Sequence, residues 1–365
     1  MKILLLSRYS RSGASSRLRS YQYLPYLQEQ GFCVTVAPFF TEEYLRHYYS
    51  GRGKPLHFAL SAYCRRIRTL LSLHQFDLIW VEAEILPWMP AWLETWLGKH
   101  TRIPYVVDYD DAIFHRYDQH SSALVRRLLG DKIDRVMRHA SLVIAGNDYL
   151  AQRAQAAGAG QVQYLPTSID LERYPLTSRH PARHGESFTI GWIGSRSTAT
   201  YIESLMGAIR SLAERRNIKL RLVGIGPHDL NTDNSFCEFS AWSESTEVHE
   251  IQQFDVGLMP LADGPWEKGK CGYKLIQYMA CQKPVIASPV GANLDIVEDN
   301  INGFLANTEE GWRFRLSELI DSPELCQHMG IAGRNKVEQH FCIQVNAAKL
   351  ARCLRTAVES RQALR

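Results

Sequence analysis

The sequence lacks the features that mark several classes of protein. Its eight cysteines form no C-x-x-C pair and show no Cys/His spacing typical of a metal site, so we interpret them as buried thiols in a reducing compartment. No apolar stretch reaches the roughly 18 residues that a membrane-spanning helix needs. Lys2 leads directly into a strand-like run rather than into a signal-peptide core. We therefore expect a cytoplasmic protein.

A strong net charge is also lacking. The formal charge of +4 is too small for the usual footprint of a nucleic-acid-binding protein. Residues 1–170 hold 20 basic against 15 acidic side chains, whereas residues 171–365 hold 22 against 23. The basic side chains that lie among aromatic ones are Arg46, Arg52, Lys54, Arg65, Arg66, Arg68, Arg126 and Arg127. This mixture fits either an ordinary solvated face or peripheral contact of the first half with the inner face of a membrane.

Strand and helix patterns alternate in both halves of the chain. Its 365 residues suit two domains of about 170 to 190 residues each. Short apolar runs at 2–7, 32–38, 76–81, 104–107, 142–145 and 162–165 predict strands, the first of the buried parallel type, and a second set starts at 188–193. We expect an α/β fold with a first domain over 1–170, a linker over 171–187, a second domain over 188–345 and a final helix over 346–365.

The stretch 255–295 carries the clearest indication of a ligand. An apolar run ending at Pro260 is followed by a loop rich in glycine and lysine, then by a helical pattern that begins at Gly272-Tyr273. A helix N-terminus at such a place binds anions. Lys270 and Lys274 beside it make a diphosphate the natural ligand, although lysines are most often solvated surface charges.

Acidic residues follow two strands of the first half. Glu82 and Glu84 end one strand, and Asp110 and Asp111 end the next. Ligands bind at the carboxyl ends of the strands in open α/β sheets. These carboxylates could cap a helix, accept hydrogen bonds from sugar hydroxyls, hold a metal or include a base with a raised pKa.

The loop after the first strand holds Gly13, which would permit close approach of a diphosphate. Arg17 and Arg19 follow in the next helix pattern. They could contact a phosphate of a donor or an acceptor, or lie on the surface.

Four segments resemble one family when taken in order. They are Leu165-Pro-Thr-Ser-Ile-Asp170, Gly191-Trp-Ile-Gly-Ser195, Phe254-Asp-Val-Gly-Leu-Met-Pro260 and the run from Lys270 to Gly291. Together they are similar to GT-B glycosyltransferases, especially to the retaining group called glycosyltransferase family 4.

The resemblance implies two Rossmann-like doubly wound domains that face a central cleft, with the final helix crossing back onto the first domain. It implies an acceptor bound mainly by the first domain and a nucleotide-sugar bound mainly by the second, with neither metal nor cofactor. The implied reaction is retaining transfer of a sugar to a hydroxyl of a glycan or glycolipid, in the synthesis of lipopolysaccharide, capsule or another surface glycan. On this basis Arg17 and Glu84 are candidate acceptor-binding residues.

The sequence also departs from the family. Gly269 and Gln277 stand where two glutamates are usual, and Ser195 and Thr200 stand where an arginine and a lysine are usual. We expect Arg196, Lys270 and Lys274 to supply the missing cations, Lys270 to be catalytic and Gln277 to bond a ribose. The expected donor site is completed by Gly13, Gly194, Ser195, Gly272 and Tyr273.

The family's usual first-domain histidine is not evident. Asp110 or Asp111 could orient or deprotonate the acceptor instead, or simply cap a helix. Two other functions remain open. They are a GT-B enzyme of the UDP-sugar 2-epimerase type and a non-catalytic subunit that binds a nucleotide-sugar.

Overall fold

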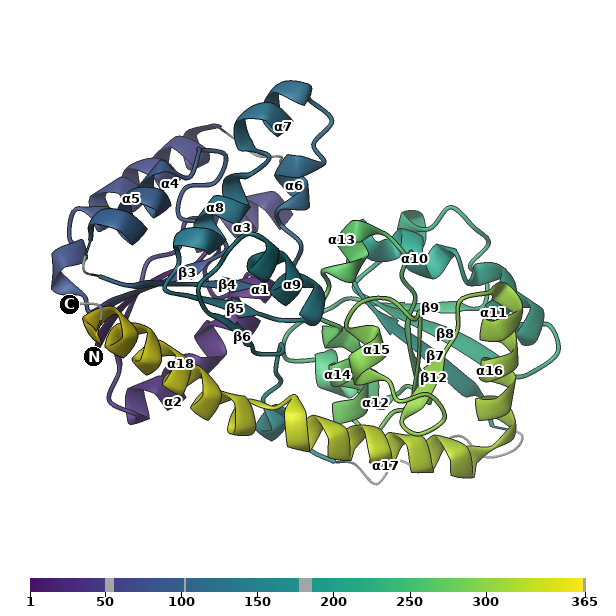
Figure 1. The fold of residues 1–365 in the computed structure, drawn as a ribbon. Helices are drawn as coiled ribbons and strands as arrows, with labels where there is room; N and C mark the ends of the chain where they lie inside the picture. Colours follow the sequence, from purple (N-terminus) through teal and green to yellow (C-terminus); the bar gives the residue numbers. More distant parts are fainter. Residues whose placement is uncertain (50–55, 102, 177–185, 364–365) are drawn as a thin grey trace. The chain divides into compact units, whose positions relative to one another are not determined.

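The computed structural model describes residues 1–49, 56–101, 103–176 and 186–363. Arg52, Lys54 and residues 177–185 of the predicted linker lie outside them. The chain divides into two compact units (Figure 1). The first unit comprises Met1–Ser168, Lys268–Cys271 and the residues from Ile343 onward, and the second comprises Ile169–Glu267 and Gly272–Cys342. The first unit thus includes four residues of the stretch that we assigned to the second domain.

The first unit is built on a parallel sheet of six strands in the order β2-β1-β3-β4-β5-β6. The strands are β1 (Lys2–Leu6), β2 (Cys33–Val36), β3 (Leu78–Glu82), β4 (Tyr105–Tyr109), β5 (Leu142–Ala145) and β6 (Val162–Tyr164). They coincide with the predicted apolar runs. The strands β3, β4 and β5 are buried throughout, because strands covered on both faces need apolar side chains on both, whereas the edge strands β2 and β6 are partly exposed. The chain winds outward from β1 to β2 and then returns to β3. The topological switch point therefore lies between β1 and β3.

Helices cover both faces of this sheet. They are α1 (Ala14–Arg19), α2 (Leu24–Glu29), α3 (Glu42–Tyr49), α4 (Leu56–Leu70), α5 (Trp92–His100), α6 (His115–Asp118), α7 (Ala123–Leu129), α8 (Lys132–His139), α9 (Asp148–Ala156) and α18 (Ile343–Ala363). Two 3-10 turns, η1 (Tyr21–Tyr23) and η2 (Leu73–Gln75), belong to the same unit. The helix predicted over 17–30 is broken into α1, η1 and α2, and Pro25 stands in the first turn of α2.

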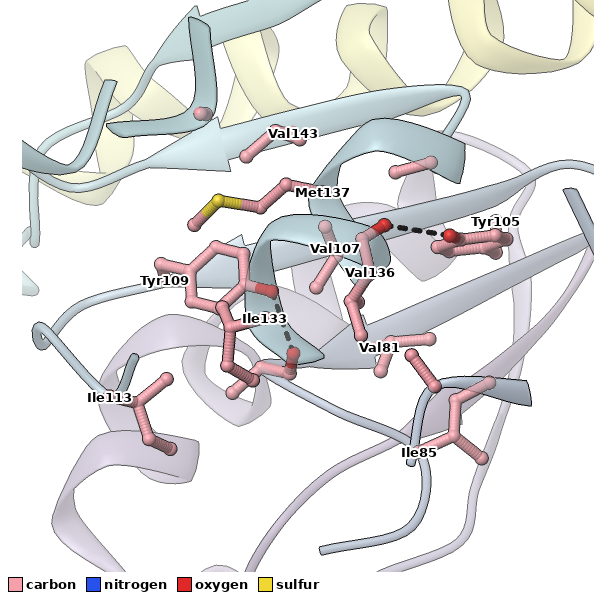
Figure 2. Close-up of a cluster of buried hydrophobic side chains, with 14 of the residues drawn as sticks. Val81, Ile85, Tyr105, Val107, Tyr109, Ile113, Ile133, Val136, Met137 and Val143 are labelled. Atoms are coloured by element: carbon pink, nitrogen blue, oxygen red, sulfur yellow. Dashed lines mark hydrogen bonds between the residues drawn. The ribbon is translucent and has the colours of Figure 1, made fainter. Parts of the chain in front are cut away.

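Two apolar clusters form the core of the first unit. One packs Leu4, Ile79 and Val81 under α5, α8 and α9. Figure 2 shows part of it, where Tyr105 Oη donates to the Val136 carbonyl at 2.7 Å and Tyr109 Oη donates to the Ala83 carbonyl at 2.8 Å. The other cluster packs the opposite face of the sheet against α2 and α18. The last helix of the chain is therefore part of the first unit.

The second unit has a parallel sheet of six strands in the order β12-β11-β10-β7-β8-β9. Its strands are β7 (Phe188–Ile193), β8 (Ile218–Val223), β9 (Cys237–Ser240), β10 (Val256–Met259), β11 (Val285–Ala287) and β12 (Gly303–Leu305). This is the Rossmann strand order, with its switch point between β7 and β10. The sequence did not predict β9, a four-residue edge strand that is only partly buried.

The helices of the second unit are α10 (Ala199–Glu203), α11 (Met206–Ala213), α12 (Glu247–Gln252), α14 (Tyr273–Ala280), α15 (Asn293–Ile296), α16 (Glu309–Asp321) and α17 (Pro323–His340). Another helix, α13 (Pro265–Lys268), ends at the first of the four residues that are counted with the first unit. Three 3-10 turns are η3 (Leu171–Arg173), η4 (Arg196–Thr198) and η5 (Pro227–Asp229). The prediction of an α/β chain with two Rossmann-like doubly wound sheets is confirmed. Within the described residues, no helix is both long and apolar enough to cross a bilayer.

Candidate functional site

A cavity of about 130 Å³ lies at the switch point of the first unit. Its lining comes from the carboxyl ends of β1, β3 and β4 and from the segments that follow them: Arg8, Tyr9, Ser15, Glu82, Ala83, Tyr109, Asp110, Asp111, Ile113 and Arg116. The register that pairs Glu82 with Asp108 brings these strand ends together. This is where open α/β sheets bind ligands.

The backbone at the cavity wall is strained. Ala83 has a φ of 63°, a left-handed conformation that costs an alanine roughly 1 kcal/mol or more. The conformation is held by hydrogen bonds on both sides of the residue, because its N–H donates to the Asp108 carbonyl at 3.0 Å and its carbonyl accepts from Tyr109 Oη. Strain of this kind tends to be retained at functional sites.

Glu82 is a buried carboxylate in this cavity. Its Oε2 accepts from Ser16 Oγ at 2.5 Å and from the Arg8 main-chain N–H at 2.9 Å. Burial and the nearby charge of Asp110 raise the pKa of the Glu82 carboxyl to about 7, against the lowering effect of the hydrogen bonds from Ser16 and Arg8. Glu82 therefore takes up a proton near neutral pH.

Asp110 and Asp111, our two candidate catalytic carboxylates, both line the cavity. Asp110 Oδ2 accepts from Ser15 Oγ at 2.5 Å. Burial and the neighbouring Asp110 raise the pKa of Asp111 to about 7, against the opposing effects of Lys270 and Arg116. A carboxylate that titrates near neutral pH and lines a cavity can accept a proton from a bound hydroxyl group.

Arg8 and Arg116 add two cations that we did not predict. Arg8 lies two residues after the end of β1, and its Nη1 lies 3.7 Å from Glu84 Oε1. That Nη1 atom is buried without a hydrogen-bond partner among the described residues. Burial and the proximity of Arg8 lower the pKa of Arg116. The position of Arg8 near the end of the first strand could have indicated that it lines a ligand site. No sequence pattern indicated this for Arg116, because a loop separates it from the preceding strand.

Glu84 does not line the cavity. Its two oxygens accept hydrogen bonds from Tyr117 Oη at 3.0 and 2.8 Å, and Lys132 Nζ forms an ion pair with it. The left-handed conformation of Ala83 changes the direction of the chain after Glu82, and the Glu84 carboxylate is buried in the core. This placement speaks against the acceptor-binding role that we predicted for Glu84.

Gly13 and Arg17 lie at the start of the first unit, in and before α1. Gly13 precedes α1, and a Cβ on it would approach Tyr9 Cβ to 2.3 Å, so this glycine is required for internal packing. Arg17 is buried, with 5% of its surface exposed, and is not at the surface. The neighbouring Arg19 is paired with Asp108 at 2.7 Å. None of these contacts requires a phosphate.

The loop between α13 and α14 is held by the first unit. Asn147 Nδ2 donates to the main-chain oxygens of Lys268 at 3.1 Å and of Lys270 at 3.0 Å. A Cβ on Gly269 would come within 2.4 Å of Ala112 Cβ and 2.6 Å of its nitrogen. Cys271 Sγ lies 3.1 Å from the Asp110 carbonyl. This position therefore has no room for the glutamate that is usual in the family.

The two lysines of the predicted diphosphate site lie in different units. Lys270 belongs to the first unit, where its charge lowers the pKa of Asp111. Lys274 is in the first turn of α14 in the second unit, and its Nζ lies 4.3 Å from the centre of the Trp192 ring. Tyr273 opens α14 after Gly272, whose φ of 66° and contact with Ile296 suit glycine alone.

Gly194, Ser195 and Arg196 follow β7 at the switch point of the second unit. A Cβ on Gly194 would meet the Trp192 ring at 2.1 Å. Ser195 caps the short η4 turn together with Thr198. The Arg196 side chain is 82% exposed and pairs with Asp229 at 2.8 Å.

Gln277 is buried inside the second unit. Only 3% of its surface is exposed, and its Nε2 donates to Tyr174 Oη at 3.2 Å. Tyr174 Oη in turn donates to Glu247 Oε1 at 2.8 Å. The side chain thus serves an internal network, which speaks against its predicted bond to a ribose. The helical pattern did not predict this, because all six residues from Leu275 to Ala280 are buried and α14 is therefore covered on more sides than its apolar face.

A metal-binding group is absent from the part of the chain that the structure describes: nowhere in it do three His, Cys, Asp or Glu side chains gather with suitable geometry. At the cavity, Glu82 accepts hydrogen bonds from the Ser16 hydroxyl and the Arg8 main-chain N–H, and Asp110 accepts one from the Ser15 hydroxyl.

Sequence patterns of two families match the chain in succession. Residues 11–167 match the glycosyl transferase 4-like domain. Residues 187–322 match the glycosyl transferases of group 1. The first pattern covers most of the first unit, including all residues that line the cavity except Arg8 and Tyr9. The second begins at β7 and covers the sheet of the second unit.

Similar proteins include a candidate teichuronic acid biosynthesis glycosyltransferase, TuaH, of Bacillus subtilis. It is 23% identical over 176 residues, which are 44% of this chain and 42% of that protein, so the chain spans less than half the length of this relative. Sucrose-phosphate synthase from Thermosynechococcus elongatus has the same fold, with a TM-score of 0.72 and 16% identity over 99% of this chain and 100% of that one. Anabaena HepE, solved with UDP-glucose, also has this fold. Its TM-score is 0.72, and it is 18% identical over 98% of this chain and 100% of that one.

Proposed function

We propose a reaction for this chain, which belongs to the GT-B glycosyltransferases of the glycosyltransferase 4-like type. The reaction moves a sugar from a nucleoside-diphosphate sugar to a hydroxyl group of a glycan or glycolipid. We further propose that the product is a cell-surface polysaccharide. The name of the TuaH relative, which places that protein in teichuronic acid synthesis, supports this.

The cavity of the first unit carries the proposal. It combines a carboxylate that titrates near pH 7, Asp111, with hydroxyl and guanidinium donors in one small space. A sugar hydroxyl needs both donors and acceptors around it, and it must lose a proton when it attacks the donor sugar. Asp111 would accept that proton, while Arg8 and Arg116 bind oxygen atoms of the acceptor.

The donor diphosphate would be bound by Lys270, Lys274 and the N-terminus of α14. Such groups stabilise the negative charge that develops on the leaving diphosphate, which is the main catalytic requirement of this reaction. No metal or cofactor enters the proposal. HepE, which was solved with UDP-glucose, supports a uridine diphosphate donor. The test described below also includes nucleotides with other bases.

Retention of configuration at the transferred sugar remains a proposal that rests on the family. It requires the hydroxyl group to attack from the face on which the diphosphate leaves, with Asp111 accepting the proton on that face, because a single displacement from the opposite face inverts the configuration. Nuclear magnetic resonance of the first-formed product distinguishes it, because retention preserves the anomeric configuration of the donor and inversion changes it.

A non-catalytic subunit that binds a nucleotide-sugar is the second candidate. Two observations favour it: Gly269 supplies no carboxylate and has no room for one, and Gln277 is buried. Turnover by the purified chain separates this candidate from an enzyme. Assays for free sugar and for epimerised nucleotide-sugar would reveal a 2-epimerase.

The test begins with thermal unfolding in the presence of UDP, GDP, ADP, CMP and their sugars. A ligand that binds the folded chain raises its melting temperature by mass action. The sugar nucleotide that stabilises the chain is then incubated with it, and release of the nucleoside diphosphate is measured. Suppose that the chain binds a nucleotide-sugar but releases no nucleoside diphosphate at any pH from 6 to 9, with or without a glycan acceptor. That result would reject the enzyme and favour the non-catalytic subunit.

We also propose a cytoplasmic location. All eight cysteines are free thiols, which is usual in a reducing compartment.

A further inference from the structure

Trp88 is held in a strained turn at the surface of the first unit. The Met89 N–H donates to the Leu86 carbonyl at 3.3 Å, which closes a turn around Pro87. Trp88 occupies the third position of that turn with a φ of 62°. A turn with proline second and a positive φ third is of type II, and its third position normally takes glycine because other side chains are strained there. The chain instead places a tryptophan at that position.

The main chain and the ring of Trp88 are both fixed. Its main-chain N–H donates to Tyr117 Oη at 3.1 Å. The indole ring makes edge-to-face contacts with the Tyr117 ring, at 5.2 Å between ring centres, and with the His120 ring at 5.7 Å. Even so, 46% of the residue is exposed. Core packing therefore does not account for the strained turn, and strain that persists in this way tends to serve a function.

Trp88 adjoins the cavity to which we assign the acceptor. Tyr117 Oη also donates to Glu84 Oε1 at 3.0 Å, and that oxygen lies 3.7 Å from Nη1 of Arg8 in the cavity wall. Arg116, another residue of the wall, directly precedes Tyr117 in α6. Three short contacts thus join the cavity wall to the Trp88 main chain. Two linked sugar rings can span that distance.

An exposed indole ring beside polar groups matches the chemistry of a sugar ring. A pyranose has a face of C–H groups that packs on an aromatic ring, and a rim of hydroxyl groups that needs hydrogen-bond partners. His120 can supply one partner, because its Nδ1 accepts from the Ser122 N–H at 3.0 Å and its Nε2 then carries the ring proton. A ring that is already fixed loses little entropy when a ligand packs on it. A bilayer needs no fixed ring orientation, so it would not account for the strained turn.

We propose that Trp88 forms a second sugar subsite, in which the apolar face of a sugar packs on the indole ring. The inference rests on the proposed transfer reaction and adds a substrate class to it, an acceptor with at least two sugar units. The terminal unit would lie in the cavity with its hydroxyl group at Asp111, and the preceding unit would lie on Trp88. A glycine at this position would relieve the strain but remove the ring.

The test is binding of simple glycans to the full chain without a nucleotide-sugar. Three matched pairs serve as probes: glucose and cellobiose, galactose and lactose, and N-acetylglucosamine and N,N′-diacetylchitobiose. At least one disaccharide should bind about 5- to 10-fold more tightly than its monosaccharide, because one stacking contact contributes about that factor. Nuclear magnetic resonance of the indole N–H groups follows the titration. The Trp88 signal is the one that Trp88→Gly lacks, and the disaccharide should shift it.

Trp88→Gly should lose this gain and bind the disaccharide only as tightly as the monosaccharide. Its melting temperature should change little, because glycine relieves the strained φ while the ring contacts are lost. Trp88→Phe keeps an aromatic ring and should retain part of the gain. Trp92→Ala is the matched control, since Trp92 is an exposed tryptophan (65%) in α5 of the same unit. It should bind both sugars like the unchanged chain.

Equal affinity of the unchanged chain for each disaccharide and its monosaccharide would overturn the proposal, as would a full gain in Trp88→Gly. Loss of binding to phosphatidylglycerol vesicles in Trp88→Gly, with glycan binding unchanged, would assign the ring to a lipid surface instead. Release of the nucleoside diphosphate tests the transfer reaction separately. A chain that binds the disaccharide through Trp88 but releases none would reject the reaction and keep the subsite. Turnover with the same KM for the disaccharide in Trp88→Gly would reject the subsite alone.

Discussion

The side-chain amide of Asn147 donates to the main-chain oxygen of Lys270 at 3.0 Å. The same Nδ2 donates to the Lys268 oxygen at 3.1 Å, and Oδ1 accepts from the Leu150 N–H at 2.9 Å to cap α9. One buried side chain therefore starts a helix and fixes the loop that brings Lys270 near Asp111.

Asn147→Asp should disturb the loop while keeping the helix cap. The carboxylate can still accept from Leu150, but it cannot donate to the two carbonyl oxygens and places negative charge beside them. We expect a loss of about 2–4 kcal/mol in the free energy of unfolding, because two buried acceptors lose their partner. We also expect the KM for the donor to rise at least ~10-fold, because a displaced Lys270 would bind the diphosphate more weakly by at least that factor. Steady-state kinetics and urea unfolding measure both. Wild-type values for each would exclude this role of Asn147.

Gly269→Glu, which restores the usual family residue, should not increase activity. Its Cβ would overlap with Ala112, and overpacking of this kind costs about 1–3 kcal/mol. Gly160→Ala in the same unit is the control, since a Cβ there meets nothing within 4 Å. Thermal unfolding should show a lower melting temperature for Gly269→Glu alone. A stable Gly269→Glu chain with faster turnover would show that the loop adopts another conformation.

The activity should depend on pH through Asp111. The pKa of its carboxyl is raised to about 7, and only the deprotonated form can accept a proton. The value of kcat/KM should therefore rise with pH up to about 7 and then level off. Rates with the stabilising donor, measured from pH 5 to 9, test this. A profile that is flat between pH 5 and 7 would rule out a base with this pKa.

Lys132→Met should unfold the first unit more easily. Lys132 pairs with Glu84 in the core and also donates to the Leu86 carbonyl at 2.7 Å. Removal of one partner leaves a buried charge, which costs about 3–5 kcal/mol. The Glu84→Gln/Lys132→Met variant should recover part of that loss, because neither charge remains. Urea unfolding of the unchanged chain, the Lys132→Met and Glu84→Gln single variants and the double variant gives the coupling free energy between the two side chains. If the double variant were no more stable than Lys132→Met, the pair would not be the cause.

The sequence predicted the strands well because strands buried on both faces require continuous apolar runs. It also placed Asp110 and Asp111 correctly at a strand end that lines a cavity. It did not predict that Glu84 pairs with Lys132 in the core, because that placement follows the left-handed turn at Ala83, and an alanine does not predict such a turn. It failed for Arg66, which is buried and donates to the Ser7 carbonyl, because a basic helix does not reveal its own rotation. The burial of Gln277 depends on Tyr174, which is 103 residues away in the chain.

The central claim is that Asp111 accepts the proton of the attacking hydroxyl group. The most direct test compares the unchanged chain with Asp111→Asn, using Asp131→Asn as a control because Asp131 is an exposed carboxylate of the same unit. Release of the nucleoside diphosphate is measured with saturating donor, and donor affinity is measured separately by calorimetry. We predict that Asp111→Asn binds the donor at least as tightly, because a negative charge near Lys270 is removed, and turns it over at least ~100-fold more slowly, the usual effect of losing a general base. Turnover equal to that of the unchanged chain would contradict the claim.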